Sequence, residues 1–200
     1  MSSWAATEKS QVDEHSVVVA GSGGQGVLLL GQTIACAGML LGKHVSWFPM
    51  YGPEMRGGRA ACWVVIAEED VGSPVVAHPD DGILLDSIAV GERADTVRSG
   101  GTLVLNASLI HDVSPRDDVD VVAVRATGLA EQLGDVRVAN MVMLGAYAKR
   151  AGALPLESLP DALKRVLPKR HHQFMPLNLR AIEAGANCVR TGNEPLTGKP

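Results

Sequence analysis

Residues 17–31 read V-V-V-A-G-S-G-G-Q-G-V-L-L-L-G and join three local signals in one stretch. An apolar run at 17–20 is typical of a buried strand, and four glycines follow within six positions. Apolar residues at helical spacing then begin at Val27. The stretch therefore predicts a strand, a glycine turn and the start of a helix.

The glycine turn is a candidate site for an anion. Backbone N–H groups at the start of a helix have no partners within the helix, and they lie at the positive end of its dipole. Gly21, Gly23 and Gly26 fit the G-x-G-x-x-G spacing of turns that bind phosphate. The same spacing also occurs in tight turns that bind nothing, so the pattern alone leaves both interpretations open.

Two common nucleotide sites do not match this turn. A dinucleotide site needs a carboxylate at the end of the second strand to bind the ribose, but residues 43–50 are K-H-V-S-W-F-P-M. A nucleoside triphosphate P-loop needs Lys followed by Ser or Thr, but Val27 and Leu28 follow Gly26. These differences disfavour NAD and ATP as ligands.

Composition predicts a single aliphatic domain. The chain has 200 residues, of which 46% are hydrophobic and only 4% aromatic. Its net charge of −4 gives no electrostatic reason to expect nucleic acid as a partner. No apolar run is long enough to predict a membrane span, and we expect a cytoplasmic protein without a secretion signal.

The three cysteines do not predict a metal centre. Cys36, Cys62 and Cys188 lie far apart and none has C-x-x-C spacing. Spacing also gives no Ser-His-Asp or Cys-His arrangement, so we expect neither a metal site nor a catalytic side chain. Asp80, Asp81 and Asp86 are interpreted as turn residues.

Strands alternating with helices predict a three-layer α/β sandwich with a largely parallel sheet. Residues 1–14 are expected to be a flexible arm, 15–190 a single domain and 191–200 a polar tail. Gly42 is predicted to end the first helix, Pro49 to close the second strand, and Thr127 to cap a helix. The predicted strands are 17–20, 45–48, 59–67, 83–86, 102–106 and 119–124. The predicted helices are 27–41, 87–99, 127–133, 138–150, 159–167 and 177–184.

Three segments together resemble a known family. They are A-G-S-G-G-Q-G-V-L-L-L-G at 20–31, Y-G-P-E-M-R-G-G at 51–58 and A-N-M-V-M-L-G-A at 139–146. The chain resembles the gamma subunit of 2-oxoacid:ferredoxin oxidoreductases, most closely that of the 2-oxoglutarate enzyme. The segment N-L-R-A-I-E-A-G at 178–185 looks like the last helix of that family. The resemblance covers nearly all of the chain after residue 15 and implies the fold of the gamma domain of pyruvate–ferredoxin oxidoreductase.

The resemblance implies a role within a larger enzyme. Family members oxidatively decarboxylate a 2-oxoacid to an acyl-coenzyme A and pass the electrons to ferredoxin. Thiamine diphosphate, Mg and [4Fe–4S] clusters belong to the partner alpha and beta subunits, with a delta subunit in some complexes. This chain would help to bind and orient coenzyme A and would be inactive alone.

The same resemblance implies which residues approach coenzyme A. Arg56 is the favoured phosphate ligand because a guanidinium forms paired, charge-assisted hydrogen bonds, although pairing with Glu54 is the competing interpretation. Pyruvate enzymes have two lysines where this chain has Glu54 and Met55, so the positive charge must come from Arg56 or Arg59. Tyr51 is expected to pack at a subunit interface. The implied binding residues are Ser22, Gly23, Gly24, Gln25, Gly26, Glu54, Met55, Arg56 and Asn140.

Two alternatives remain open. The chain could be the small subunit of an indolepyruvate-type enzyme, which has a similar glycine turn; the Pro-Glu-Met-Arg segment at 53–56 favours 2-oxoglutarate instead. It could also be a stand-alone nucleotide-binding module, which the missing ribose carboxylate disfavours.

Overall fold

The computed structural model describes residues 14–51, 58–111 and 116–189. The predicted residues Glu54, Met55 and Arg56 and the predicted tail lie outside these ranges. The strands are β1 (Glu14–Ser22), β2 (His44–Tyr51), β3 (Arg59–Ala67), β4 (Asp81–Leu84), β5 (Thr102–Asn106) and β6 (Asp120–Val124). The α-helices are α1 (Val27–Leu40), α2 (Ser87–Arg93), α3 (Ala126–Leu133), α4 (Ala139–Ala151), α5 (Leu159–Val166) and α6 (Met175–Cys188). Short 3-10 helices are η1 (Ala94–Thr96), η2 (Val136–Val138), η3 (Leu156–Ser158) and η4 (Lys169–Phe174).

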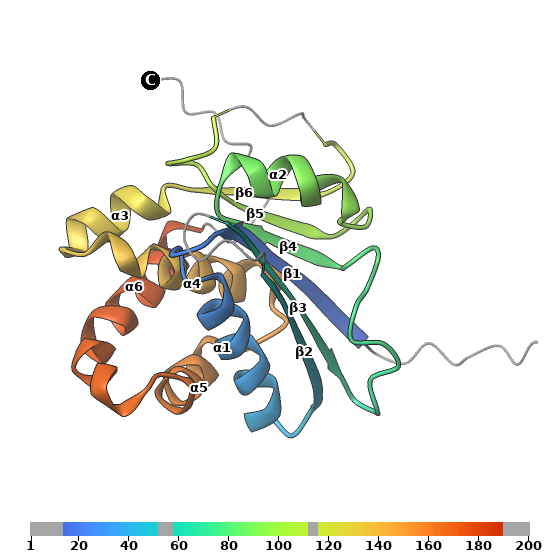
Figure 1. Ribbon diagram of the computed structural model, residues 1–200, viewed down its shortest axis with the longest axis horizontal. Coiled ribbons are helices and arrows are strands. Elements are labelled where there is room, and N and C mark those ends of the chain that lie inside the picture. Colours follow the sequence, from blue (N-terminus) through green and yellow to red (C-terminus); the bar gives the residue numbers. More distant parts are fainter. Residues whose placement is uncertain (1–13, 52–57, 112–115, 190–200) are drawn as a thin grey trace, which may run out of the picture.

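The strands form one six-stranded sheet in the order β2-β3-β1-β4-β5-β6 (Figure 1). β1, β4, β5 and β6 are parallel, whereas β3 is antiparallel to both β1 and β2. β2 ends at Tyr51 and β3 begins at Arg59, and so short a connection cannot make the crossover that parallel strands need, so the two strands pair as an antiparallel hairpin. The predicted α/β class with a largely parallel sheet is confirmed, with this hairpin added at one edge.

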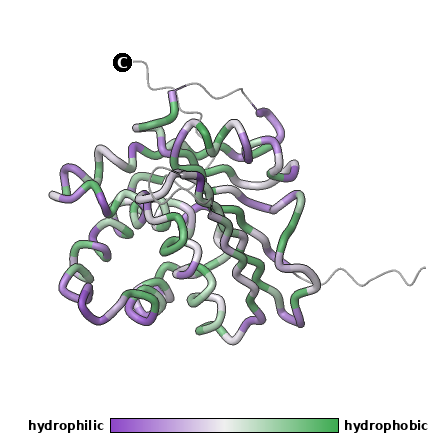
Figure 2. Tube along the Cα trace, viewed as in Figure 1, coloured by the Kyte–Doolittle hydropathy of each residue, from purple (hydrophilic) through white to green (hydrophobic). Residues whose placement is uncertain are grey.

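Helices cover the two faces of the sheet unequally, giving three layers (Figure 1). One face packs against α1, α3, α4, α5 and α6 and contains most of the core, which is aliphatic as composition predicts. The other face packs against α2 and η1 over a smaller core that includes Trp63. Hydrophobic colour follows the strands and the inner helices, while the segment between α5 and α6 is hydrophilic (Figure 2).

Several predicted boundaries are confirmed and others are wrong: β4 is Asp81–Leu84 rather than 83–86, α2 is Ser87–Arg93 rather than 87–99, and α6 is Met175–Cys188 rather than 177–184. β3 and β5 have the predicted bounds, and Gly42 follows α1 with a φ of 79°. Pro49 does not close β2, which continues to Tyr51; β2 is an edge strand, where a residue without an N–H is tolerated. Thr127 does not cap α3, because it lies inside the helix and its Oγ1 accepts a hydrogen bond from Asn106. β1 begins at Glu14, one residue inside the predicted arm.

The crossing of α4 and α6 is unusually close. A Cβ atom at Gly145 would lie 1.9 Å from the Ile182 carbonyl oxygen, and one at Gly185 would lie 1.9 Å from the Val142 carbonyl oxygen. The two backbones therefore touch at a point where each helix supplies a glycine. This contact fixes the position of α4, whose first turn reaches the glycine turn after β1.

Among the described residues, no helix is both long enough and apolar enough to cross a lipid bilayer.

Candidate functional site

The glycine turn after β1 is held in shape by Gln25. The Ser22 N–H donates a hydrogen bond to Gln25 Oε1 at 2.7 Å, and the Gln25 N–H donates to the Ser22 carbonyl at 3.2 Å. A Cβ atom at Gly21 would lie only 2.4 Å from the same Oε1. Glycine at this position therefore leaves the space into which the Gln25 side chain folds.

Asn140 fixes the other end of the turn. Gly26 precedes α1 with a φ of 75°, a conformation that favours glycine. The Asn140 side-chain amide donates a hydrogen bond to the Gly26 carbonyl at 3.2 Å, and a Cβ atom at Gly26 would lie 2.2 Å from that nitrogen. Asn140 is buried and lies in the first turn of α4. It therefore brings the starts of α4 and α1 together.

Two further hydrogen bonds tie the turn to its surroundings. Ser22 Oγ donates to Asp86 Oδ2 at 2.6 Å, and Asp86 Oδ1 caps α2 by accepting from the Ala89 N–H at 2.9 Å. The Gly23 N–H donates to the Gly58 carbonyl at 2.7 Å. Gly58 ends the Y-G-P-E-M-R-G-G segment, so at least this end of the segment lies against the glycine turn.

The turn suits an anion. Gly23 and Gly24 are exposed, and a Cβ atom built on Gly24 would meet no atom within 4 Å. α1 has no side-chain cap and no acidic residue in its first turn. The start of α4, joined to Gly26 by Asn140, adds a second positive helix end. The N–H groups of Ser22, Gly23 and Gln25 are already bonded within the protein, so the backbone N–H groups at the start of α1, together with the two helix dipoles, are the ones that can hold a phosphate here.

The structure brings together Ser22, Gly23, Gly24, Gln25, Gly26 and Asn140, as the sequence predicts for one site. Gln25 and Asn140, however, each make a hydrogen bond that shapes the turn itself. Arg59, the other predicted source of charge, is paired with Glu92 at 2.7 Å. Asp86 is the residue of this site that sequence reasoning treated only as part of a turn.

A groove of about 550 Å³ adjoins the turn on the α2 side of the sheet. Arg93 lies over the Trp63 ring, 5.0 Å from its centroid, and its buried Nε makes no hydrogen bond within the described residues. No sequence motif predicts this groove. The only sequence signal is the alternation along β2, where the exposed Phe48 and Met50 are separated by the half-buried Pro49. Its lining residues are Ala20, Gly21, Met50, Tyr51, Arg59, Ala60, Ala61, Ile88, Ala89, Glu92 and Arg93.

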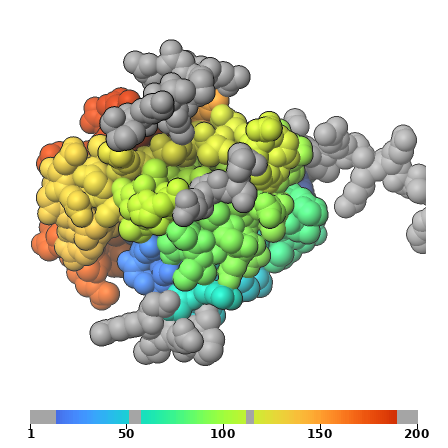
Figure 3. Space-filling model, turned by 90° about the horizontal axis from the view of Figure 1, so that it is seen from above, coloured from blue at the N-terminus to red at the C-terminus, as the bar shows by residue number. Residues whose placement is uncertain are grey.

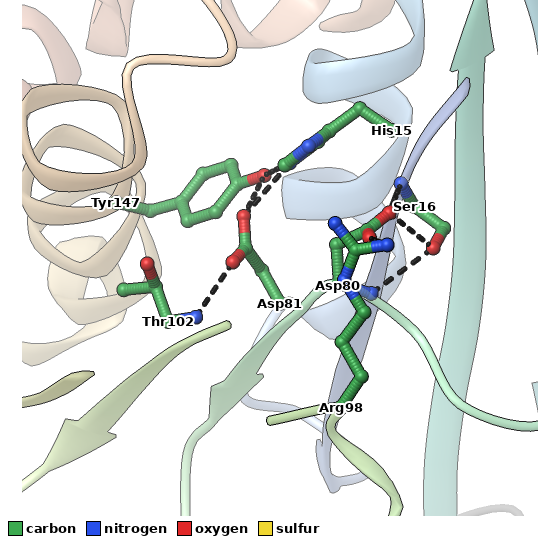
Figure 4. Close-up of polar contacts among 7 residues, drawn as sticks. All are labelled: His15, Ser16, Asp80, Asp81, Arg98, Thr102 and Tyr147. Atoms are coloured by element: carbon green, nitrogen blue, oxygen red, sulfur yellow. Dashed lines mark hydrogen bonds and ion pairs between the residues drawn. The ribbon is translucent and has the colours of Figure 1, made fainter. Parts of the chain in front are cut away.

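A buried polar cluster lies where the parallel strands begin, at the end of the sheet opposite the glycine turn (Figure 4). Asp81 accepts hydrogen bonds from the His15 ring at 2.8 Å, from Tyr147 at 3.2 Å and from the Thr102 N–H at 2.8 Å. The neighbouring Asp80 accepts from Ser16 N–H and Oγ, and pairs with Arg98. Both carboxylates are buried. The interpretation of Asp80 and Asp81 as simple turn residues is therefore wrong.

This cluster predicts a pH dependence of stability. Burial of the His15 ring opposes its protonation, but the hydrogen bond and charge of Asp81 outweigh that effect and raise the pKa of His15 above 6.5. A raised folded-state pKa stabilises the fold below about pH 6.5, and this contribution is lost as pH rises through the folded value. We therefore expect the difference in unfolding free energy between wild type and His15→Gln to decrease as pH rises from about 6.5 through the folded-state pKa of His15.

Urea unfolding at a series of pH values measures this difference. His44→Gln is the matched control, because His44 pairs with an almost fully exposed Asp70 and such pairs contribute little. Parallel pH profiles for wild type and His15→Gln would show that the cluster does not bind the proton more tightly in the folded state.

Two observations on the described residues concern metal ligands and the Cys62 thiol. No group of three His, Cys, Asp or Glu side chains there is arranged to hold a metal ion. Burial raises the pKa of Cys62 to about 12, which keeps this thiol protonated.

The family model for pyruvate ferredoxin/flavodoxin oxidoreductase matches residues 16–188. The chain is 40% identical over 182 residues to the ketoisovalerate oxidoreductase subunit VorA of Methanothermobacter marburgensis, covering 90% of this chain but only 38% of VorA. It is 31% identical to the 2-oxoglutarate synthase subunit KorC of the same organism, covering 88% of this chain and 97% of KorC.

Two solved structures have a fold similar to that of this chain. The gamma subunit of a keto/oxoacid ferredoxin oxidoreductase from Geobacter sulfurreducens matches 86% of this chain and 96% of its own, with a TM-score of 0.74 and 27% identity. The 2-oxoglutarate:ferredoxin oxidoreductase of Magnetococcus marinus, solved with 2-oxoglutarate, coenzyme A and succinyl-CoA, matches 90% of this chain and 32% of its own, with a TM-score of 0.78 and 22% identity. From the family match over 16–188, the glycine turn and the shared fold, we conclude that the chain belongs to the pyruvate ferredoxin/flavodoxin oxidoreductase family.

Proposed function

We propose that this chain is the gamma subunit of a multi-subunit, cytoplasmic 2-oxoacid:ferredoxin oxidoreductase, and that its glycine turn holds phosphate groups of coenzyme A. The observation that carries the proposal is the meeting of two helix starts at an open turn, through the hydrogen bond from Asn140 to Gly26. Coenzyme A has a pyrophosphate and a 3′-phosphate, which suit such a site. The Magnetococcus relative, solved with coenzyme A, supports this choice of ligand.

The contribution of this chain to the reaction would be orientation. Ser22 to Gly26 contain no side chain that titrates near neutral pH, so the turn cannot act as an acid or a base. Fixing the phosphates would instead raise the effective concentration of the coenzyme A thiol at the acyl group. Thiamine diphosphate, Mg and [4Fe–4S] clusters on alpha, beta and any delta subunits would supply decarboxylation and electron transfer to ferredoxin.

Two 2-oxoacids are candidates for the substrate. The Pro-Glu-Met-Arg segment favours 2-oxoglutarate, and the similarity to KorC agrees with it. The higher identity to VorA favours the branched substrate ketoisovalerate. A purified complex tested with both acids separates these candidates by the ratio of their kcat/KM values.

Arg56→Ala tests the role of the Y-G-P-E-M-R-G-G segment at 51–58. If the Arg56 guanidinium binds a phosphate, its removal should raise KM for coenzyme A about tenfold or more in the assembled complex, since charge-assisted hydrogen bonds contribute about 1.5–3 kcal/mol. The KM for the 2-oxoacid should not change. Coenzyme A-dependent reduction of ferredoxin by the purified complex measures both constants.

The control is Lys43→Ala, because Lys43 pairs with Glu68 at the end of the sheet opposite the glycine turn, where β2 begins and β3 ends. An unchanged KM for coenzyme A in Arg56→Ala would remove Arg56 from the site. Ferredoxin reduction by the isolated chain would contradict the proposed role as a subunit, as would purification of the tagged chain from its own cells without thiamine- and cluster-bearing partners.

A further inference from the structure

The groove beside α2 belongs to an incompletely covered face of the sheet. α2 packs over β1 and β4, and α1 covers β2 and β3 only from the opposite face. On the α2 side, Phe48, Met50 and Ile88 are exposed by 42–53%. Seen from that side, the green residues of α2 lie near the centre of the surface, and cyan and teal residues of the β2–β3 hairpin lie beside them (Figure 3). An apolar cluster of this kind on a soluble domain marks an interaction site.

The groove also carries an unbalanced positive charge. Arg93 makes no ion pair within the described residues, and its guanidinium is held in place by the Trp63 ring beneath it. At the rim, Arg59 is balanced by Glu92. A partner that fits this groove would therefore present an apolar side chain together with a carboxylate, because a fixed guanidinium pairs well with a carboxylate.

The relatives indicate which partner this is. KorC corresponds to this chain over almost its whole length, whereas VorA contains an equivalent region joined to a longer remainder within one polypeptide. The same domain thus occurs as a separate chain and covalently joined to another part. The part of VorA that is covalently joined to this domain is therefore expected to correspond to a subunit that contacts the domain when the domain is a separate chain.

We propose that the groove is the docking face for the partner subunit that corresponds to the remainder of VorA. This inference rests on the proposed function as a subunit. The partner places an apolar side chain between Met50 and Ile88 and a carboxylate against Arg93. Gly21 lines the groove and also begins the glycine turn, so docking here places the coenzyme A site at the edge of the subunit interface.

The test uses the complete chain co-expressed with the alpha and beta subunits encoded in its own organism. Met50→Glu and Ile88→Glu should each weaken assembly at least tenfold, measured as the dissociation constant between the purified chain and the partner subunits. Arg93→Gln should weaken it several-fold. Val136→Glu is the matched control, because Val136 is 50% exposed, close to Ile88 at 53%, but lies in η2 away from the groove. Thermal unfolding of each isolated variant verifies that it folds.

A photo-cross-linking residue in place of Met50 identifies the occupant. A cross-linked peptide from the subunit that matches the remainder of VorA supports the proposal, whereas a peptide from any other subunit or from a second copy of this chain overturns it. If wild type assembles and the two glutamate variants assemble equally well, the docking face is wrong and the proposed function stands. If wild type itself binds neither subunit, the proposed function fails.

Discussion

Replacing Gly145 or Gly185 by alanine is expected to lower the free energy of unfolding by about 3 kcal/mol, the upper part of the range for overpacked cores. Each added Cβ would lie 1.9 Å from a backbone carbonyl oxygen of the other helix, at Ile182 or Val142. A clash with backbone cannot be relieved by a change of rotamer, so α4 and α6 must separate. Denaturation by urea, followed by circular dichroism, measures the loss.

The control is Gly91→Ala in α2. A Cβ atom at Gly91 would meet no atom within 4 Å, and alanine is favoured over glycine inside a helix by about 0.5–1 kcal/mol. This variant should therefore be slightly more stable than wild type. Equal stability of Gly145→Ala and wild type would show that the two helices can move apart without loss, and that the close crossing does not hold α4 in place.

Sequence patterns predicted the elements that depend on neighbours along the chain. The strand, glycine turn and helix at 17–31 follow from an apolar run, glycine spacing and helical periodicity, and the structure has them as β1, the turn and α1. β3 and β5 have the predicted bounds, and each contains an uninterrupted apolar run, at 60–67 and at 103–105. Local propensity and tertiary packing agree at these places.

Contacts between distant residues could not be predicted in this way. His15, Asp81 and Tyr147 form one cluster, but no spacing in the sequence links them. The groove likewise needs residues of β2, β3 and α2 together. The resemblance indicated that Asn140 belongs near the ligand, yet only the structure shows that its amide binds the Gly26 carbonyl. Such pairings depend on the fold as a whole.

The second large effect is expected from Asn140→Asp, which should raise KM for coenzyme A at least tenfold in the assembled complex. The amide that donates to the Gly26 carbonyl would be replaced by an oxygen that repels it. A negative charge would also be placed beside the proposed phosphate site. Two unit charges about 5 Å apart at an effective dielectric constant of about 20 interact by about 3 kcal/mol, and about 1.4 kcal/mol corresponds to a factor of ten.

The position of Asn140 makes this effect separable from a loss of folding. It lies in the first turn of α4, where a carboxylate is favoured by the helix dipole, so the helix itself should tolerate the change. Asn178→Asp is the matched control: Asn178 is also buried and also donates to a backbone carbonyl, that of Phe174, but it lies in α6. We expect KM for coenzyme A to rise only in Asn140→Asp, while KM for the 2-oxoacid stays constant in both. If both variants raise it equally, the effect comes from general loosening of the helical layer. If neither does, coenzyme A does not bind at the glycine turn, and the phosphate role assigned to two converging helix starts is wrong.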